Sequence, residues 1–392
     1  MKMSLRGAML CAVMTLAPGT VFAQSTVTEI VSFLVTNQAV RTGAPERDRE
    51  AAEITRDTIT RALLLNLTSV PIATSSSGFL YRLNPQLGTV ERATDSFGGY
   101  FVERALTAGH GRASFGISGT TASFDRLDDE DLRSGTLLTV AAKLRDEAVP
   151  FDSETLTLKV RSSTMTAYAS VGITDRFEIG GAVPFVRLTI EGQRVSVTRG
   201  ETFLEASGSA TASGIADVAV RAKYTLVAGR NGGAAIAAEW RLPTGNEDNL
   251  LGAGATAFRV IGIAALERGP LMLSGNAGIV RGGTGVSDEF VAGGAAAVAV
   301  HPRLSLTGEV MARDVADLRP IAYSTQPHPT IAGADTIRLV AGDPGRSIAG
   351  AITGFKWNPS GTLVIGANVR WNFTTAGLTA PLTPSVALEY SF

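Results

Sequence analysis

Charge, cysteine and long apolar runs are all scarce in this chain of 392 residues. Charged residues make up 18% of the sequence, against about 25% in soluble domains. The single cysteine, Cys11, lies close to the N-terminus, and no later stretch approaches the ~20 continuous apolar residues of a membrane helix. These absences exclude a helical membrane protein and a disulfide scaffold, and they argue against a soluble enzyme or a disordered chain.

Glycine is abundant instead, at 43 residues, and the mean hydropathy is mildly positive at +0.18. An outer-membrane β-barrel combines these properties, because its apolar residues occupy alternate positions along strands rather than continuous runs. The formal net charge of −1 gives no indication of a nucleic-acid partner. Composition alone therefore favours one large all-β membrane barrel over two or three soluble domains.

The first 23 residues have the pattern of a secretory signal peptide. Lys2 and Arg6 precede the apolar segment Ala8–Leu16, and Val21–Ala23 forms a small-x-small cleavage site. A large residue precedes Cys11, which argues against lipidation. We therefore expect export across the inner membrane, with the only cysteine removed together with residues 1–23.

Residues 24–108 differ from the rest of the chain in composition and in the spacing of their apolar residues. Residues 46–66 carry apolar residues at helical spacing, which predicts one amphipathic helix, and residues 69–78 are rich in serine and proline. This segment is too short to bury a core of its own. The predicted organisation is a signal peptide (1–23), an N-terminal helix with a plug or periplasmic segment (24–108), and an outer-membrane β-barrel (109–392).

From Gly111 onward the apolar period changes to two. In Thr362–Phe373, for example, Leu363, Ile365 and Val369 share one face. Such strands are longer than the ~5–6 residues usual in a soluble β-sandwich, the main alternative. We assume a periplasmic C-terminus, and five short turns then alternate with six longer connections, which predicts twelve antiparallel strands. Residues 97–108 could add a strand, while residues 135–144 are expected to form a hairpin extension outside the membrane.

Charged residues on the polar strand faces are expected to line the lumen, because Arg or Lys on the lipid face costs ~2–4 kcal/mol at the midplane. Two roles remain open for them: a network of paired charges that rigidifies the barrel, or residues that set a constriction and its selectivity. The candidates are Arg187, Asp217, Arg221, Lys223, Glu239, Arg241, Glu309, Arg313, Arg370 and Glu389.

Residues suited to catalysis or metal binding are few. His110 and His301 fall in or beside predicted periplasmic turns, and His328 lies in a long outer loop. No serine or aspartate with catalytic spacing can be placed beside them, and there is no His/Cys cluster. The sequence therefore predicts no enzyme activity, no cofactor and no metal site.

Two segments resemble known outer-membrane sequences. The C-terminal phenylalanine, Phe392, with Tyr390 before it, resembles the signal recognised by the barrel assembly machinery. The stretch from Tyr168 to Phe185, which contains Thr174-Asp175-Arg176 and Pro184, resembles the "YGxTDRxxxGxxxP" strand–turn–strand of the phenol-degradation meta-pathway family of outer-membrane proteins. Similar segments follow at residues 213–217, 222–224 and 241–245, so that the resemblance covers roughly residues 160–392.

The resemblance implies an outer-membrane barrel, and members of the family are described as channels by association with aromatic degradation. Pro184 lacks an N–H group, and we expect a bulge there that would turn Val186, Leu188 and Ile190 outward. The leading functional hypothesis is a passive channel for small, fairly apolar, possibly aromatic organic molecules. The alternative is a structural or surface-interaction barrel without transport. The expected partners are outer-membrane lipid, the barrel assembly machinery and a small organic solute.

A twelve-stranded barrel is wider than one whose interior side chains can fill, so its lumen has room for a small plug. We expect residues 75–104 to enter the barrel mouth from the periplasmic side. There Asp95, Glu103 and Arg104 would meet lumen charges such as Arg221 and Arg241. The rival hypothesis is a loose periplasmic tail.

Deletion of Phe392 is expected to impair assembly, because the terminal strand must be recognised and must close against the first strand. The amount of folded barrel in outer-membrane fractions, seen as heat-modifiable mobility on gels, measures this effect. Normal levels of the truncated protein would refute the prediction.

Overall fold

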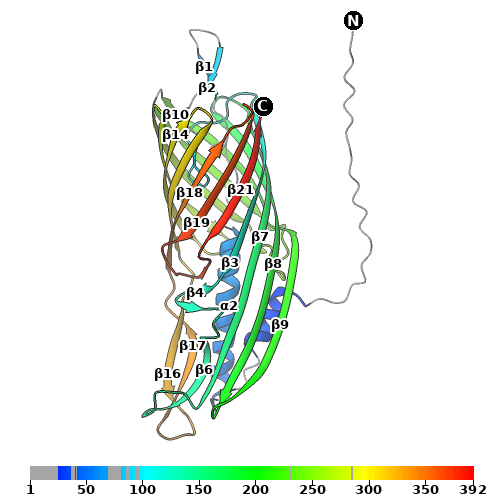
Figure 1. Ribbon diagram of the computed structural model, residues 1–392, viewed down its shortest axis with the longest axis vertical. Helices are drawn as coiled ribbons and strands as arrows, with labels where there is room; N and C mark the ends of the chain where they lie inside the picture. The colour runs from blue at the N-terminus through cyan, green and yellow to red at the C-terminus, as the bar shows by residue number, and fades with distance from the viewer. Residues whose placement is uncertain are drawn as a thin grey trace, which may run out of the picture.

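The structure is a computed structural model that describes residues 25–36, 40, 42–68, 81–84, 89–92, 97–229, 231–283 and 286–392. Its centre is a closed antiparallel barrel whose strands follow one another around the ring in the order β7-β3-β21-β19-β18-β15-β14-β13-β12-β11-β10-β8 (Figure 1). Pairing of β7 with β8 closes the ring. The predicted number of twelve strands is confirmed. The strands are β3 (Ala113–Phe124), β7 (Asp152–Gly172), β8 (Phe177–Thr198), β10 (Val218–Gly229), β11 (Gly232–Leu242), β12 (Ala257–Arg268), β13 (Leu271–Gly282), β14 (Glu289–His301), β15 (Leu304–Val315), β18 (Arg346–Trp357), β19 (Leu363–Asn372) and β21 (Thr383–Ser391).

The barrel has two different ends. At the short-turn end, tight turns join β7 to β8, β10 to β11, β12 to β13, β14 to β15 and β18 to β19. The C-terminus lies at the same end, where Phe392 and Ala113 exchange two backbone hydrogen bonds of 2.9 Å. The longer connections lie at the opposite, long-loop end, as the turn lengths predicted.

The two faces of the barrel wall carry different side chains. Large apolar residues such as Val220, Ile236 and Trp240 project from the outer face, where they form the lipid-facing belt of a transmembrane barrel. Small and polar residues such as Ser170, Glu309 and Asn368 are buried on the inner face. No described helix has the length and apolar content needed to cross a membrane.

Strands β7 and β8 continue far past the belt at the long-loop end, and there the apolar face changes sides. On β8, Val183 and Phe185 are exposed on the outer face, but Val186, Leu188 and Ile190 are buried on the inner face. The β7–β8 register runs unbroken from Gly172↔Glu178 to Asp152↔Thr198. The predicted bulge at Pro184 is therefore wrong: the surroundings of the strand change, and its register does not.

The position of Pro184 has a simple physical reason. On its second side, β8 pairs with β10 as far as Ala182 and with β9 (Glu201–Ile215) from Phe185 onward. Pro184 lies between these two ladders, where its missing N–H group interrupts neither of them.

The extended ends of β7 and β8 form the middle of an outer sheet with the order β16-β17-β6-β7-β8-β9. Its other strands are β6 (Leu137–Leu144), β16 (Ile321–Pro327) and β17 (Ala334–Ala341). The hairpin extension predicted at residues 135–144 is thus confirmed, and residues 193–207 continue β8 and begin β9. A smaller sheet, made of β20 (Leu378–Thr379), β4 (Arg126–Leu127) and β5 (Glu130–Asp131), lies beside it.

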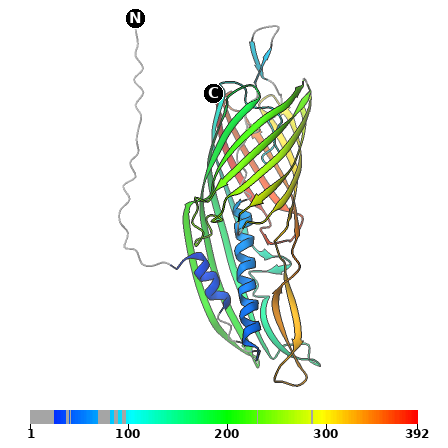
Figure 2. The same ribbon diagram turned by 180° about the vertical axis from the view of Figure 1, so that it is seen from behind.

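Two helices, α1 (Val27–Thr36) and α2 (Pro45–Thr68), cover the inner face of the outer sheet (Figure 2). They share a hydrophobic core with it, in which Leu34, Ile59 and Leu63 pack against a set that includes Leu158 and Leu188. This core explains why the inner face of β7 and β8 becomes apolar there: it meets helices instead of the lumen.

The N-terminal segment therefore differs from the sequence-based expectation in two ways. Helix α2 matches the predicted helix, but α1 was not predicted. Both helices lie at the long-loop end, opposite the end where the first barrel strand begins, and the hairpin β1 (Tyr81–Asn84) and β2 (Thr89–Arg92) lies beyond the short-turn end (Figure 1). The predicted signal peptide falls outside the described residues.

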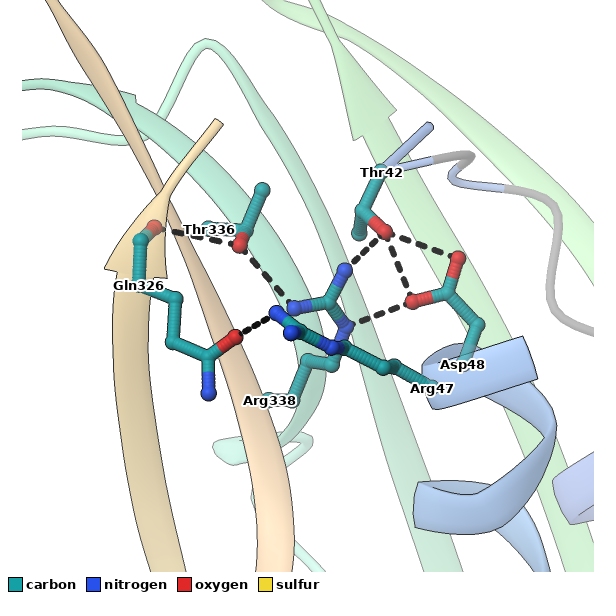
Figure 3. Close-up of polar contacts among 6 residues, drawn as sticks. All are labelled: Thr42, Arg47, Asp48, Gln326, Thr336 and Arg338. Carbon is teal, nitrogen blue, oxygen red and sulfur yellow. Dashed lines mark hydrogen bonds and ion pairs between the residues drawn. The ribbon is translucent and has the colours of Figure 1, made fainter. Parts of the chain in front are cut away.

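A buried ion pair fixes the start of α2 to β17 (Figure 3). The Nε atom of Arg338 lies 2.6 Å from Oδ1 of Asp48, and the two side chains are 6% and 14% exposed. The hydroxyl of Thr42 donates to the Asp48 carboxylate, and Arg338 donates to Thr42 and to Oγ1 of Thr336. The Arg338 guanidinium thus binds Asp48 and Thr42 of the N-terminal segment as well as Thr336 of its own strand.

The substitution Asp48→Ala is expected to loosen α2, because it leaves the Arg338 guanidinium buried without its counter-charge. We expect the free energy of local opening of α2 to fall by about 3 kcal/mol, or more than a hundredfold in amide exchange. Arg49→Ala serves as the control, since the Arg49–Glu46 pair is 66% and 82% exposed and such pairs contribute ~0–1 kcal/mol. Equal exchange rates in the two variants would contradict the prediction.

Candidate functional site

The lumen segment, Phe97–Ala108, crosses the interior of the barrel from wall to wall. Its first half binds residues of β15, β18 and β19, and its second half binds residues of β8 and β10 on the opposite side of the ring. An extended segment inside a barrel leaves backbone polar groups without ladder partners, so inward-facing side chains must supply them. The hydrogen bonds described below do so.

Glu309 on β15 holds the first half of the lumen segment. Its carboxylate accepts hydrogen bonds from three consecutive backbone N–H groups, those of Tyr100, Phe101 and Val102, the last two at 2.9 Å. Lys356 donates from Nζ to the Gly99 carbonyl at 2.5 Å. Charged partners make these hydrogen bonds stronger than neutral ones, so Glu309 and Lys356 fix the backbone of this turn.

The barrel wall also leaves room for the segment. The Tyr100 hydroxyl donates to the carbonyls of Phe355 and Ala367, and a Cβ at Gly366 would lie 2.9 Å from that hydroxyl. A Cβ at Gly293 would lie 3.0 Å from Cγ2 of Val102. Glycine is thus required where the lumen segment approaches the wall most closely.

The second half of the segment is held by β8 and β10. Glu103 and Arg221 form a buried ion pair, as the sequence suggested. Lys223 donates to the Leu106 carbonyl at 2.9 Å, and Glu178 accepts from the N–H of Ala108 at 2.8 Å. Arg104 is also buried, whereas Asp95 lies outside the described residues.

The structure places nine of the ten charged candidates on the inner face and one outside. The exception, Arg187, is exposed on the outer face of β8, next to Phe185 and just beyond the lipid-facing belt. Its expected lumen position depended on the bulge at Pro184, which does not form. Of the others, Asp217 binds a loop: its carboxylate accepts from the N–H groups of Gly245 and Ala253 at 3.0 and 2.8 Å.

Above the lumen segment, toward the long-loop end, lie two neighbouring cavities whose linings share Phe101, Met311 and Arg313; together we call them the chamber, and each of them is one half of it. Phe101 of the lumen segment lines its floor, and Leu65 of α2 lines it on the side of the long loops. One half, lined by β10 to β15, is rich in charge, with four arginines and three glutamates. The other half, lined by β15, β18, β19 and β20, is largely apolar. The charged residues are Glu103, Arg221, Glu239, Arg241, Arg259, Glu289 and Arg313, and the apolar half includes Met311, Ile348, Ile352, Leu378 and the cation Arg370.

Most chamber charges are paired. Arg313 makes two hydrogen bonds of 2.9 and 2.8 Å to the Glu289 carboxylate, a bidentate arrangement. Arg241 binds Glu239 at 2.9 Å rather than Glu103, and Arg259 lies 3.9 Å from the same Glu239. The expected charge network is therefore present in this half of the chamber.

Two of the three histidines lie at the short-turn end of the barrel, and the third lies at the opposite end of the molecule. His110 lies at the short-turn end, where its Nδ1 donates a hydrogen bond of 2.7 Å to the Ile173 carbonyl. His301 is also at that end, and His328 lies at the tip of β16 and β17. Among the described residues, no group of three His, Cys, Asp or Glu side chains could hold a metal ion.

Comparison with known families identifies the barrel. A family model described as "Putative MetA-pathway of phenol degradation" matches residues 145–380, more than half of the chain. The chain belongs to this family. The match covers β7 and every later strand up to β20 and confirms the resemblance seen in the sequence. No curated protein sequence matches the chain.

Several solved outer-membrane structures are similar in outline. An outer membrane channel from Pseudomonas putida F1 is 11% identical, with 74% of this chain and 98% of that chain covered, at a TM-score of 0.48. A FadL homologue from Pseudomonas aeruginosa is 10% identical, with 72% and 89% covered, at a TM-score of 0.32. At these scores neither likeness bears on function.

Glu309→Ala is expected to release the first half of the lumen segment, because three backbone N–H groups lose their shared acceptor. Amide exchange at Tyr100, Phe101 and Val102 should rise by roughly tenfold or more. Glu191→Ala is the matched control, since Glu191 is exposed on the outer face of β8. If both variants protect these three amides as well as the wild type does, Glu309 does not hold the segment.

Proposed function

We propose that the protein is a passive outer-membrane channel for small, fairly apolar organic molecules of the phenol class. The chamber carries this proposal: two neighbouring cavities inside the lumen share Phe101, and one of them is largely apolar while the other is lined by charge. Such a lining suits a small ring with one polar group, because apolar walls hold the ring and a few polar groups orient it. Membership of a family named for phenol degradation supports the same class.

The proposal includes a cellular location and an orientation. Residues 1–23 would direct export, and the barrel assembly machinery would insert the chain through its C-terminal Tyr390 and Phe392. The short-turn end would face the periplasm, so that the outer sheet and both helices would face the exterior. In this orientation a solute would meet α2 first, then the chamber, and then the lumen segment. We propose no enzymatic role.

A structural or surface-interaction barrel without transport is the second candidate, and one observation favours it. The lumen segment crosses the barrel and is held by Glu309 on one wall and by Arg221 and Lys223 on the other. A channel therefore requires a solute path beside this segment or a displacement of it. A purely structural barrel requires neither.

Filling the chamber separates the two candidates. Met311 lines the chamber, and Met311→Trp should slow phenol uptake by intact cells roughly fivefold or more, because the larger ring occupies the solute's space. Met165→Trp makes the same chemical change on the lipid-facing side of β7, where Met165 is 56% exposed, and it should leave uptake unchanged. Uptake that is the same with and without the wild-type barrel would reject the channel and favour the structural role.

A further inference from the structure

One arginine of the chamber stands apart from the rest. Arg370, on the inner face of β19, lies opposite Ile352 of β18 and Thr383 of β21 in the strand register. It lines the apolar half of the chamber with Phe101, Ile348 and Leu378. Among the described residues, no ion pair or hydrogen bond of its guanidinium is found.

The nearest charged groups cannot neutralise Arg370, because they are already engaged. Of the residues that the structure describes, Arg313 is the only other ionisable one that lines this half, and both of its hydrogen bonds go to Glu289. Glu309 lies two strands away, opposite Ile352 in the register, and its carboxylate is occupied by the backbone of the lumen segment. Arg370 therefore places an uncompensated positive charge beside apolar walls.

The charge balance of the whole chamber agrees with this local picture. The residues lining its two halves include five arginines and three glutamates, an excess of positive charge. A guanidinium removed from water without a partner is costly, and a carboxylate can restore two charge-assisted hydrogen bonds to it.

We propose that the chamber binds organic acids with a small aromatic body and a single carboxylate, and that Arg370 binds the carboxylate. The ring of the ligand lies against Phe101, Ile352 and Leu378. A single unpaired cation beside apolar walls suits one carboxylate rather than a multiply charged phosphate. This inference rests on the proposed function of the barrel as a channel and defines its substrate class more narrowly.

The test compares two probes of equal ring size, benzoate and benzyl alcohol, which differ in charge. Binding to the purified full-length protein in detergent is measured by calorimetry for the wild type and for Arg370→Met, Arg370→Lys and Arg187→Met. We expect Arg370→Met to weaken benzoate binding by roughly tenfold or more while benzyl alcohol binding stays unchanged. Arg370→Lys, which keeps the charge, should retain part of the benzoate affinity, and the outward-facing Arg187→Met should retain all of it.

The outcomes distinguish this inference from the proposed function. If the wild type binds benzyl alcohol and Arg370→Met leaves benzoate binding unchanged, or weakens both probes equally, the carboxylate site is wrong and the channel proposal stands. If the wild type binds neither probe, both are overturned. Heat-modifiable mobility of each variant on gels shows that the barrel has folded, so that a loss of binding is not a loss of structure.

Discussion

The pairing of β7 with β8 is the interaction on which the rest of the structure depends. Within the membrane it closes the ring, and closure is the only way in which a sheet can satisfy every backbone N–H and C=O group in lipid. Beyond the membrane the same ladder continues without a shift and becomes the middle of the outer sheet. The helices α1 and α2 then pack on its inner face. One hairpin thus belongs both to the barrel wall and to the cap, which consists of the outer sheet with α1 and α2.

Much of this fold could be predicted from the sequence, because a period of two and the spacing of turns are local signals. The side of the strand on which Arg187 lies could not be predicted. Alternation shows which residues share a face, but it does not show whether that face contacts lipid, the lumen or another element. Phe185 is exposed on the outer face and Val186 is buried in the core that the outer sheet shares with the helices, and both positions take an apolar residue. Helix α1 did leave a local signal: Thr26 and Glu29 form a capping box, in which the Glu29 N–H donates to Oγ1 of Thr26. The contact between Glu309 and the backbone of the lumen segment left none, because any residue type can provide an N–H group.

The carboxylates inside the barrel have two distinct structural roles. Glu309, Glu178 and Asp217 accept hydrogen bonds from backbone N–H groups and so hold irregular segments in place. Glu103, Glu239 and Glu289 instead neutralise arginines. Of the two roles considered for the lumen charges, most of them therefore fit the structural one. Arg370 belongs to neither set, because it pairs with no described carboxylate and holds no described backbone segment in place. It is therefore a candidate for ligand recognition.

The continuity of β7 and β8 has a mechanical consequence for the cap. A lid normally opens about a few residues that absorb a change in backbone angles, but here the cap and the barrel wall share the same uninterrupted strands. No hinge separates them, and tilting the cap would require bending a paired ladder. In the proposed channel, entry to the chamber would therefore depend on side chains, around Leu65 and its neighbours Val315 and Leu318. The sizes of these residues would then set a fixed upper limit on the size of the solute.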